Sequence, residues 1–132
     1  MIVLDASAGV DFLLRRGAKG DWAAAWIRRA EVVHAPHLVD LEVVSVVRKL
    51  LLAGEVSARR AREALDDFAQ LAIVRYSALP FVSRVWELRG RLTPYDAAYV
   101  ALAEALEVPL VTTDECLAHA GGHRAEIVAY GA

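Results

Sequence analysis

The sequence has little or no asparagine, cysteine and lysine. Asparagine is absent, Cys116 is the single cysteine, and Lys19 and Lys49 are the only lysines among 15 basic residues. One cysteine cannot form an internal disulfide, which agrees with a reducing compartment. The excess of arginine over lysine is interpreted mainly as the mark of a GC-rich genome, with phosphate recognition by guanidinium groups as the alternative.

Long apolar runs and phosphate-binding glycine motifs are missing as well. No run approaches the roughly 18 apolar residues of a membrane span, and Asp5 interrupts the N-terminal apolar run too early for a signal peptide. We therefore expect no membrane partner and a cytoplasmic location. The sequence also has no glycine-rich phosphate loop and no glycine triplet of the dinucleotide-binding type.

The composition is that of one globular domain. The chain has 132 residues, of which 57% are hydrophobic and 24% charged, and a chain of this length buries about two thirds of its unfolded surface. We expect residues 1–132 to form a single domain. The net charge of −2 does not by itself indicate nucleic-acid binding. If the acids cluster in one pocket, however, the remaining surface is close to neutral or positive.

Strand-like and helix-like segments alternate along the chain. Short apolar runs predict strands at 2–4, 32–35, 73–76, 109–112 and 126–129. Capping residues, prolines and glycines predict helices at 7–16, 21–30, 36–54, 80–89 and 115–120, and two further helices that begin at Ser57 and at Thr93-Pro94. Strands joined by crossover helices pair in parallel. The predicted fold class is α/β, a three-layer α/β/α sandwich with a parallel central sheet.

Four carboxylates, Asp5, Glu42, Asp96 and Asp114, lie among apolar residues, where an isolated negative charge is costly. Asp5 and Asp114 end predicted strands, and the carboxyl ends of parallel strands form the ligand crevice of an open sheet. Asp96 extends the inward face of its predicted helix. Glu42 is expected two turns inside a helix that is apolar on nearly all sides, with no basic residue within one turn. A bound cation is the simplest partner for this set.

Each acid also has a structural interpretation. Asp114 is suited to be a helix N-cap, and so is Asp5, although Ser7 is better placed for the first helix. Asp96 can complement the dipole at a helix N-terminus. Glu42 has the weakest structural interpretation, because it is expected too far inside its helix to be a cap and would be a buried glutamate without a cationic neighbour. The metal site is the favoured interpretation because the predicted fold brings all four acids to one edge of the sheet.

Other residues give weaker signals. We expect Asp11 to pair with Arg15 on a helix surface. Cys116 and His119 supply too few ligands for zinc. A pair of tryptophans at helical spacing, Trp22 and Trp26, indicates core or interface rather than a platform for base stacking.

Four segments occur in a fixed order: Val3-Leu4-Asp5-Ala6-Ser7, then Glu42 in an apolar helix after a proline, then Thr93 to Ala103, then Val111-Thr112-Thr113-Asp114. Together they resemble the PIN-domain ribonucleases and, within them, the VapC toxins of bacterial VapBC toxin–antitoxin modules. The resemblance covers essentially the whole chain. It implies a Mg²⁺ or Mn²⁺ site, RNA cleavage, homodimerisation and neutralisation by a cognate VapB antitoxin.

The resemblance assigns the acidic roles to the same four carboxylates and a supporting polar role to Ser7 and Thr112. The expected reaction is hydrolysis of an RNA phosphodiester by water that the ion activates. We expect Asp5, Asp96 and Asp114 nearest the principal ion, with Glu42 orienting water or holding a second ion. Further site candidates are Arg89 and Arg91 for RNA phosphates, and Trp22 and Trp26 for the antitoxin.

Other functional classes stay open at this point. A haloacid dehalogenase-like phosphotransferase would also place an acid after the first strand, but it needs a second acid where Ser7 stands and a lysine after a strand. The receiver domain of response regulators is a second alternative, but this sequence lacks its acidic pair near the first strand and its late lysine. A catalytically inactive binding module of the same fold is the third alternative, and an assay for Mn²⁺-dependent RNA cleavage separates it from the nuclease.

Overall fold

The computed structural model describes residues 1–131, and its described part contains one five-stranded sheet in the order β3-β2-β1-β4-β5. Every neighbouring pair is parallel. The strands are β1 (Ile2–Leu4), β2 (Val33–Pro36), β3 (Ile73–Tyr76), β4 (Leu110–Thr112) and β5 (Ile127–Ala129). Because β1 and β4 are adjacent, their carboxyl ends, which carry Asp5 and Asp114, lie side by side.

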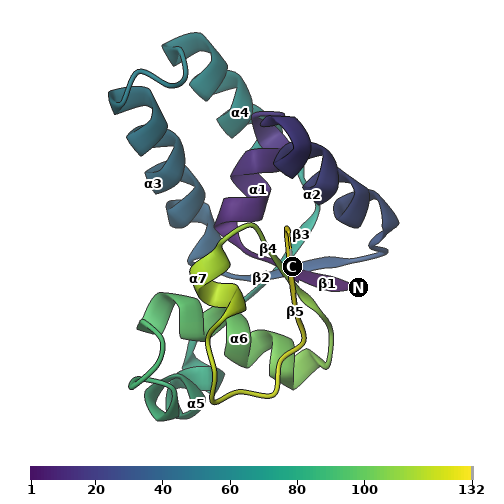
Figure 1. Cartoon of the computed structure of the whole chain (residues 1–132), viewed down its shortest axis with the longest axis vertical. Coiled ribbons are helices and arrows are strands. Elements are labelled where there is room, and N and C mark those ends of the chain that lie inside the picture. The colour runs from purple at the N-terminus through teal and green to yellow at the C-terminus, as the bar shows by residue number, and fades with distance from the viewer. Residues whose placement is uncertain (132) are drawn as a thin grey trace.

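Helices cover both faces of the sheet, which confirms the predicted three-layer class (Figure 1). The helices are α1 (Ala6–Leu13), α2 (Gly17–Arg29), α3 (Val39–Leu52), α4 (Ala58–Gln70), α5 (Val82–Glu87), α6 (Pro94–Leu106) and α7 (Glu115–Ala118), with a 3₁₀ turn η1 at Leu79–Phe81. Figure 1 shows α5 and α6 on one side of the sheet and α1 and α2 on the other, with α3 and α4 extending away as a pair. None of the helices in residues 1–131 is long and apolar enough to cross a membrane.

The core lies on both faces of β1. Ile2 and Leu4 pack with Ala8 and Ala23 from α1 and α2, whereas Val3 belongs to a second cluster that includes Tyr99 and other residues of α6. All three strand residues are buried, as expected for a parallel sheet covered on both sides. Helices α1 and α2 approach each other closely at Gly20, where an added Cβ would lie 2.6 Å from the Asp11 carbonyl oxygen.

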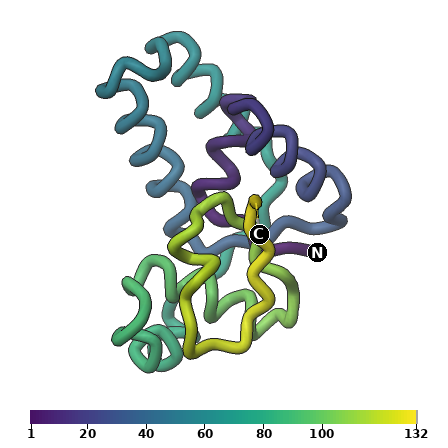
Figure 2. The backbone as a smooth tube through the Cα atoms, viewed as in Figure 1, coloured from purple at the N-terminus to yellow at the C-terminus, as the bar shows by residue number. Residues whose placement is uncertain are grey.

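Figure 2 shows the segment between α7 and β5 as a long loop that runs beside α6. Polar contacts hold this loop in place, because the Arg124 amide donates to Glu104 Oε2 at 2.7 Å. The loop therefore fixes the outer side of the helix that carries Asp96.

The predicted start of the third helix was wrong. Pro36 is the last residue of β2, and α3 begins at Val39. Glu42 therefore lies in the first turn of α3 rather than two turns inside it. The prediction that this helix is enclosed on nearly all sides was also wrong, because Leu41 is 77% exposed and Val44 45% exposed.

Two N-termini also differ from the prediction. The N-cap of α1 is Asp5, whose side chain accepts from the Ala8 amide, and not Ser7. The second helix begins at Gly17, four residues before the predicted cap Asp21. The caps of α4 and α6, Ser57 and Thr93, are confirmed.

Candidate active site

Asp5 is the most buried of the four predicted acids, with 6% of its surface exposed. Its Oδ1 accepts from the Ala8 amide at 3.0 Å and from the Ser7 hydroxyl at 2.8 Å. Its Oδ2 accepts from the Thr112 hydroxyl at 2.5 Å. Burial raises the pKa of Asp5 to about 6, although these three donors lower it, and the charge of Asp114 raises it further. The side chain is therefore fixed in position and protonates more readily than an ordinary aspartate.

The end of β4 is bonded to the start of α1. The Thr112 hydroxyl accepts from the Asp114 amide at 2.9 Å while it donates to Asp5. The Ser7 hydroxyl lies 3.3 Å from both the Thr112 hydroxyl and the Thr113 amide. Ser7 and Thr112 thus both donate to the Asp5 carboxylate.

Asp114 is the N-cap of α7, since its Oδ1 accepts from the Cys116 amide at 2.9 Å. The structural interpretation of this residue is therefore correct, and it does not exclude a second role, because a carboxylate has further lone pairs for a cation. The charge of Asp114 raises the pKa of Asp5 and of Asp96. Asp114 consequently lies within electrostatic reach of both.

Asp96 lies in the first turn of α6, and its amide donates to the Thr93 hydroxyl at 3.2 Å. Burial raises the pKa of Asp96. Burial also raises the pKa of Glu42, and the charge of Asp96 raises it further. Electrostatic coupling thus runs from Asp5 through Asp114 and Asp96 to Glu42. The four acids come from the starts of four helices, and two of these helices directly follow the strands β1 and β4.

The oxygen atoms of these four carboxylates suit a hard divalent cation, which takes oxygen ligands. Within residues 1–131, however, no three His, Cys, Asp or Glu side chains are already arranged to hold a metal ion. Asp5 is fixed by its donors, while Glu42, Asp96 and Asp114 are only partly buried. Joint coordination of one ion therefore requires rotation of these three side chains toward Asp5.

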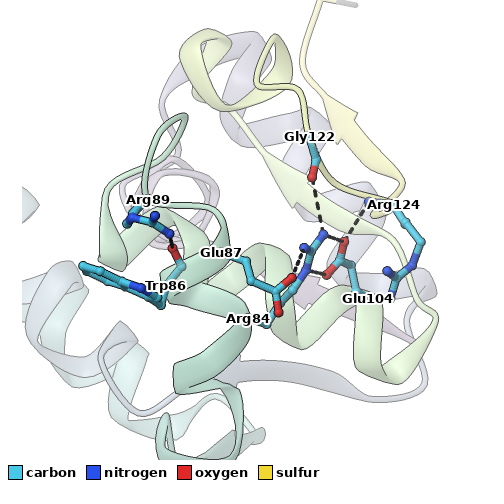
Figure 3. Close-up of polar contacts among 7 residues, drawn as sticks. All are labelled: Arg84, Trp86, Glu87, Arg89, Glu104, Gly122 and Arg124. Atoms are coloured by element: carbon cyan, nitrogen blue, oxygen red, sulfur yellow. Dashed lines mark hydrogen bonds and ion pairs between the residues drawn. The ribbon is translucent and has the colours of Figure 1, made fainter.

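The two arginines predicted to contact RNA are both exposed, and each lies against a different part of the surface. Arg89 is exposed and stacks on Trp86, with its guanidinium carbon 4.4 Å from the ring centroid (Figure 3). Arg91 packs over the turn at Gly121 and Gly122, where an added Cβ on Gly122 would lie 2.7 Å from its Cδ. Arg91 thus contacts the loop after α7, whereas Arg89 contacts its own helical segment, where its Nη1 donates to the Trp86 carbonyl at 2.9 Å.

Trp22 and Trp26 are half-buried and form an edge-to-face pair with ring centroids 6.5 Å apart. Trp22 also contacts Tyr130 at 5.7 Å, and both tryptophans pack against the core cluster that contains Ile2. The guanidinium of Arg29 lies 4.8 Å from the Trp26 ring. The two rings therefore belong to the core on one side and reach the surface on the other.

The predicted pair of Asp11 with Arg15 was wrong. Asp11 instead accepts from the Thr113 hydroxyl at 2.7 Å, and its nearest guanidinium contact is Arg16 Nε at 3.8 Å. The backbone at Arg15 turns into the left-handed region, with φ of 52°, which carries this side chain out of the i,i+4 position that a continuing helix would give it.

One polar group of the site was missed by the sequence reasoning. The Tyr99 ring is 1% exposed, and burial together with the charges of Glu42, Asp5 and Asp96 raises the pKa of its hydroxyl. The available signal was its position three residues after Asp96 on the same inward face, because a phenol on such a face needs a hydrogen-bond partner.

Comparisons with known proteins agree with the fold. The model of the PIN domain family matches residues 2–122. VapC ribonuclease Mb0985 of Mycobacterium bovis is 44% identical over 121 residues, which cover 92% of this chain and 91% of the relative. Ribonuclease VapC12 of Mycobacterium tuberculosis is 42% identical over 127 residues, which cover 96% and 97%.

A solved structure of PAE2754 from Pyrobaculum aerophilum has a TM-score of 0.69 at 28% identity and covers 96% of this chain and 81% of its own. The resemblance seen in the sequence is therefore confirmed, and the phosphotransferase and receiver-domain alternatives are set aside. The chain belongs to the PIN domain family and, within it, to the VapC ribonucleases.

Proposed function

We propose that this protein is a metal-dependent endoribonuclease, the toxin of a type II toxin–antitoxin module, which cleaves RNA and so inhibits translation and growth. The observation that carries the proposal is the coupling of Asp5, Asp114, Asp96 and Glu42 at the carboxyl edge of the sheet. Relatives at 42–44% identity are named VapC ribonucleases. The structurally similar VapC20 of Mycobacterium tuberculosis, with a TM-score of 0.66, is described as a sarcin-ricin loop cleaving toxin.

The cofactor proposed for this site is Mg²⁺ or Mn²⁺, held by the four carboxylates. When bound, it would supply Lewis-acid stabilisation of the phosphate and a lower pKa for the attacking water. Ser7 and Thr112 hold the Asp5 carboxylate in a fixed orientation and favour its charged form. Glu42, which is half-buried and can rotate, is suited to orient the attacking water. Arg89 and Arg91 are the proposed contacts to RNA phosphates, since both are exposed and guanidinium groups suit phosphate oxygens.

The experiment that tests this proposal measures Mn²⁺-dependent cleavage of RNA by purified variants. Asp5→Asn, Asp96→Asn and Asp114→Asn should each reduce turnover at least about a hundredfold, because the amide keeps the shape and loses the charge that attracts the cation. Asp66→Asn is the matched control, since Asp66 is exposed on α4 and pairs with Arg62. All variants should keep the wild-type circular dichroism spectrum. Near-wild-type turnover by two of the three would refute the site and favour an inactive binding module.

The proposed protein partner is a VapB-type antitoxin. VapBC2 from Rickettsia felis, bound to a promoter DNA fragment, resembles this chain with a TM-score of 0.67 at 18% identity, and FitAB bound to DNA resembles it with a TM-score of 0.63. These likenesses support the fold, and the proposal of an antitoxin rests on the VapC family. We place the contact on α1 and α2, where Trp22 and Trp26 reach the surface.

A homodimer is proposed as the free form of the toxin, acting in the cytoplasm. Large apolar side chains remain exposed on α3 and α5, including Leu41 at 77% and Trp86 at 66%. Exposed apolar surface of this kind favours association. Sedimentation analysis at micromolar concentration tests this directly, and a monomer at all concentrations would reject it.

A further inference from the structure

Tyr99 has a buried hydroxyl whose role the four-carboxylate site does not explain. The residue lies in the middle of α6 and is 1% exposed. Its hydroxyl oxygen is buried, and no group among the described residues meets it with hydrogen-bond geometry. Buried polar groups in folded proteins nearly always have a partner, so an exception requires an explanation.

The charged groups around this hydroxyl are carboxylates. Tyr99 belongs to the same buried cluster as Val39 and Val43, which lie on either side of Glu42 on α3, and as Ala6 and Ala97, which follow Asp5 and Asp96. Of these three carboxylates, Glu42 raises the pKa of Tyr99 most. A phenol is protonated at neutral pH, so its O–H can donate to a carboxylate oxygen. In return, the hydroxyl lowers the pKa of Glu42. The two groups thus interact favourably, although their present orientation falls short of hydrogen-bond geometry.

Glu42 is the acid that most needs such a donor. Asp5 has three hydrogen-bond donors, and Asp114 is bonded to the first turn of α7. The Glu42 carboxylate, in contrast, is half-buried in the first turn of α3, and no ion pair involves it within residues 1–131. A small rotation of the Glu42 side chain, with rotation of the phenol O–H, would complete a hydrogen bond to Tyr99.

We propose that Tyr99 is a positioning residue of the nuclease, whose hydroxyl donates to one oxygen of Glu42 and leaves the other oxygen free to face the cation and its water. The inference rests on the proposed function. Tyr99 itself is too buried to touch RNA, so its effect passes through Glu42. One donor thereby fixes the side chain that would otherwise turn toward solvent at the open end of α3.

The test begins with Tyr99→Phe, which removes one oxygen and keeps the ring. The hydrogen bond to a charged acceptor predicts a fall in kcat of roughly tenfold to a hundredfold. The KM for RNA should stay within about twofold, because an interaction made only with the catalytic group does not contribute to substrate binding. Tyr76→Phe is the matched control. Tyr76 lies on β3, which β2 separates from β1, and its hydroxyl is bonded to His34 Nδ1 at 2.8 Å. Loss of this hydroxyl should therefore leave kcat near wild type.

Coupling to Glu42 distinguishes a positioning role from a merely structural one. Glu42→Gln should lower kcat, and adding Tyr99→Phe to it should lower kcat no further, because the two residues act as one unit. A second readout needs no turnover. Titration calorimetry with Mn²⁺ alone should show an affinity about tenfold to a hundredfold weaker in Tyr99→Phe, on the scale by which partners of metal ligands affect binding, and unchanged affinity in Tyr76→Phe.

The outcomes separate this inference from the function on which it rests. If the wild type cleaves RNA and Tyr99→Phe keeps wild-type kcat and Mn²⁺ affinity, the positioning role is refuted. Independent, multiplicative effects of Tyr99→Phe and Glu42→Gln on kcat would refute it too. If the wild type does not cleave RNA, the proposed function fails, and the Mn²⁺ affinities of the two phenylalanine variants still decide the role of Tyr99.

Discussion

Arg84 and Glu104 form a two-pronged ion pair between α5 and α6, with Nε to Oε1 at 2.8 Å and Nη2 to Oε2 at 2.9 Å (Figure 3). The Glu104 side chain is 3% exposed, and its Oε2 also accepts from the Arg124 amide. Pairing with Arg84 lowers the pKa of Glu104 to about 2. Because α6 also carries Asp96 and Tyr99, this pair fixes the helix on which part of the active site depends.

Breaking this pair should destabilise the protein. Glu104→Gln leaves the Arg84 guanidinium without its buried partner, so we expect the free energy of unfolding to fall by about 2–4 kcal/mol. Glu63→Gln is the control, since Glu63 forms exposed pairs with Arg59 and Arg60, and its loss should cost under about 1 kcal/mol. Urea denaturation at pH 7 measures both, and equal costs would contradict the structural role of the buried pair.

The direction of the Glu104 pKa shift determines how the stability from this ion pair depends on pH. The pKa of Glu104 is lower in the folded protein, about 2, than its ordinary value of 4.5. The stabilisation is therefore fully present above pH 4.5 and is lost as the pH falls toward 2. Glu104→Gln should lose less stability than the wild type over this range, and equal losses in the two proteins would show that another group dominates acid unfolding.

Asp5 should make the metal-free protein less stable as the pH rises, which is the opposite of the pH dependence caused by Glu104. The pKa of Asp5 rises from 3.8 to about 6 on folding, so the folded state binds more protons between these values and stability falls as the pH rises through this window. In chelator at pH 7, Asp5→Asn should therefore raise the free energy of unfolding by up to about 3 kcal/mol. Thermal unfolding from pH 4 to pH 8 should show the gain of the variant growing with pH. A gain independent of pH would contradict the burial of a charged Asp5.

Several features of the site followed from the sequence because they depend on local patterns. The runs at β1 and β4 predicted strands whose ends place Asp5 and Asp114 together, and Thr93 before Pro94 predicted the start of α6. These features depend on propensity, capping and the parallel topology, which neighbouring residues largely determine.

Other features depend on contacts between distant segments and could not be read in this way. Ser7 loses the capping role to Asp5 because its hydroxyl lies against Thr112 and Thr113, more than a hundred residues along the chain. Pro36 extends β2 because β3 pairs with it at Tyr76. The burial of the Tyr99 hydroxyl near Glu42 could not be predicted, because it depends on the packing of α3, α6 and β1 against one another.

Metal binding should raise thermal stability through the acids. Mn²⁺ binds the folded state and should raise the melting temperature of the wild type. Asp96→Asn should show a smaller shift because it removes one proposed ligand, while its melting temperature in chelator should be higher because one repulsion is lost. Asp66→Asn should match the wild type in both conditions. Equal Mn²⁺-induced shifts in Asp96→Asn and the wild type would count against the cluster.

The antitoxin surface proposed on α2 can be tested by truncating its aromatic pair. Trp22→Ala with Trp26→Ala should weaken binding of the cognate antitoxin by more than about 1 kcal/mol, the scale that marks contributors to an interface. Because both rings also pack on the core cluster around Ile2, the double variant should lose about 2–4 kcal/mol of stability. Its folded state must therefore be checked by circular dichroism at the temperature of the titration.

Trp86→Ala is the control for this surface, because Trp86 is 66% exposed on α5, on the opposite side of the sheet from α2 (Figure 1). Its affinity for the antitoxin should match the wild type in titration calorimetry. RNA cleavage by the free double variant should survive, since the proposed metal ligands do not include either tryptophan. Unchanged antitoxin affinity together with lost cleavage would show that Trp22 and Trp26 act as core residues that support the fold, and the antitoxin contact would have to lie elsewhere.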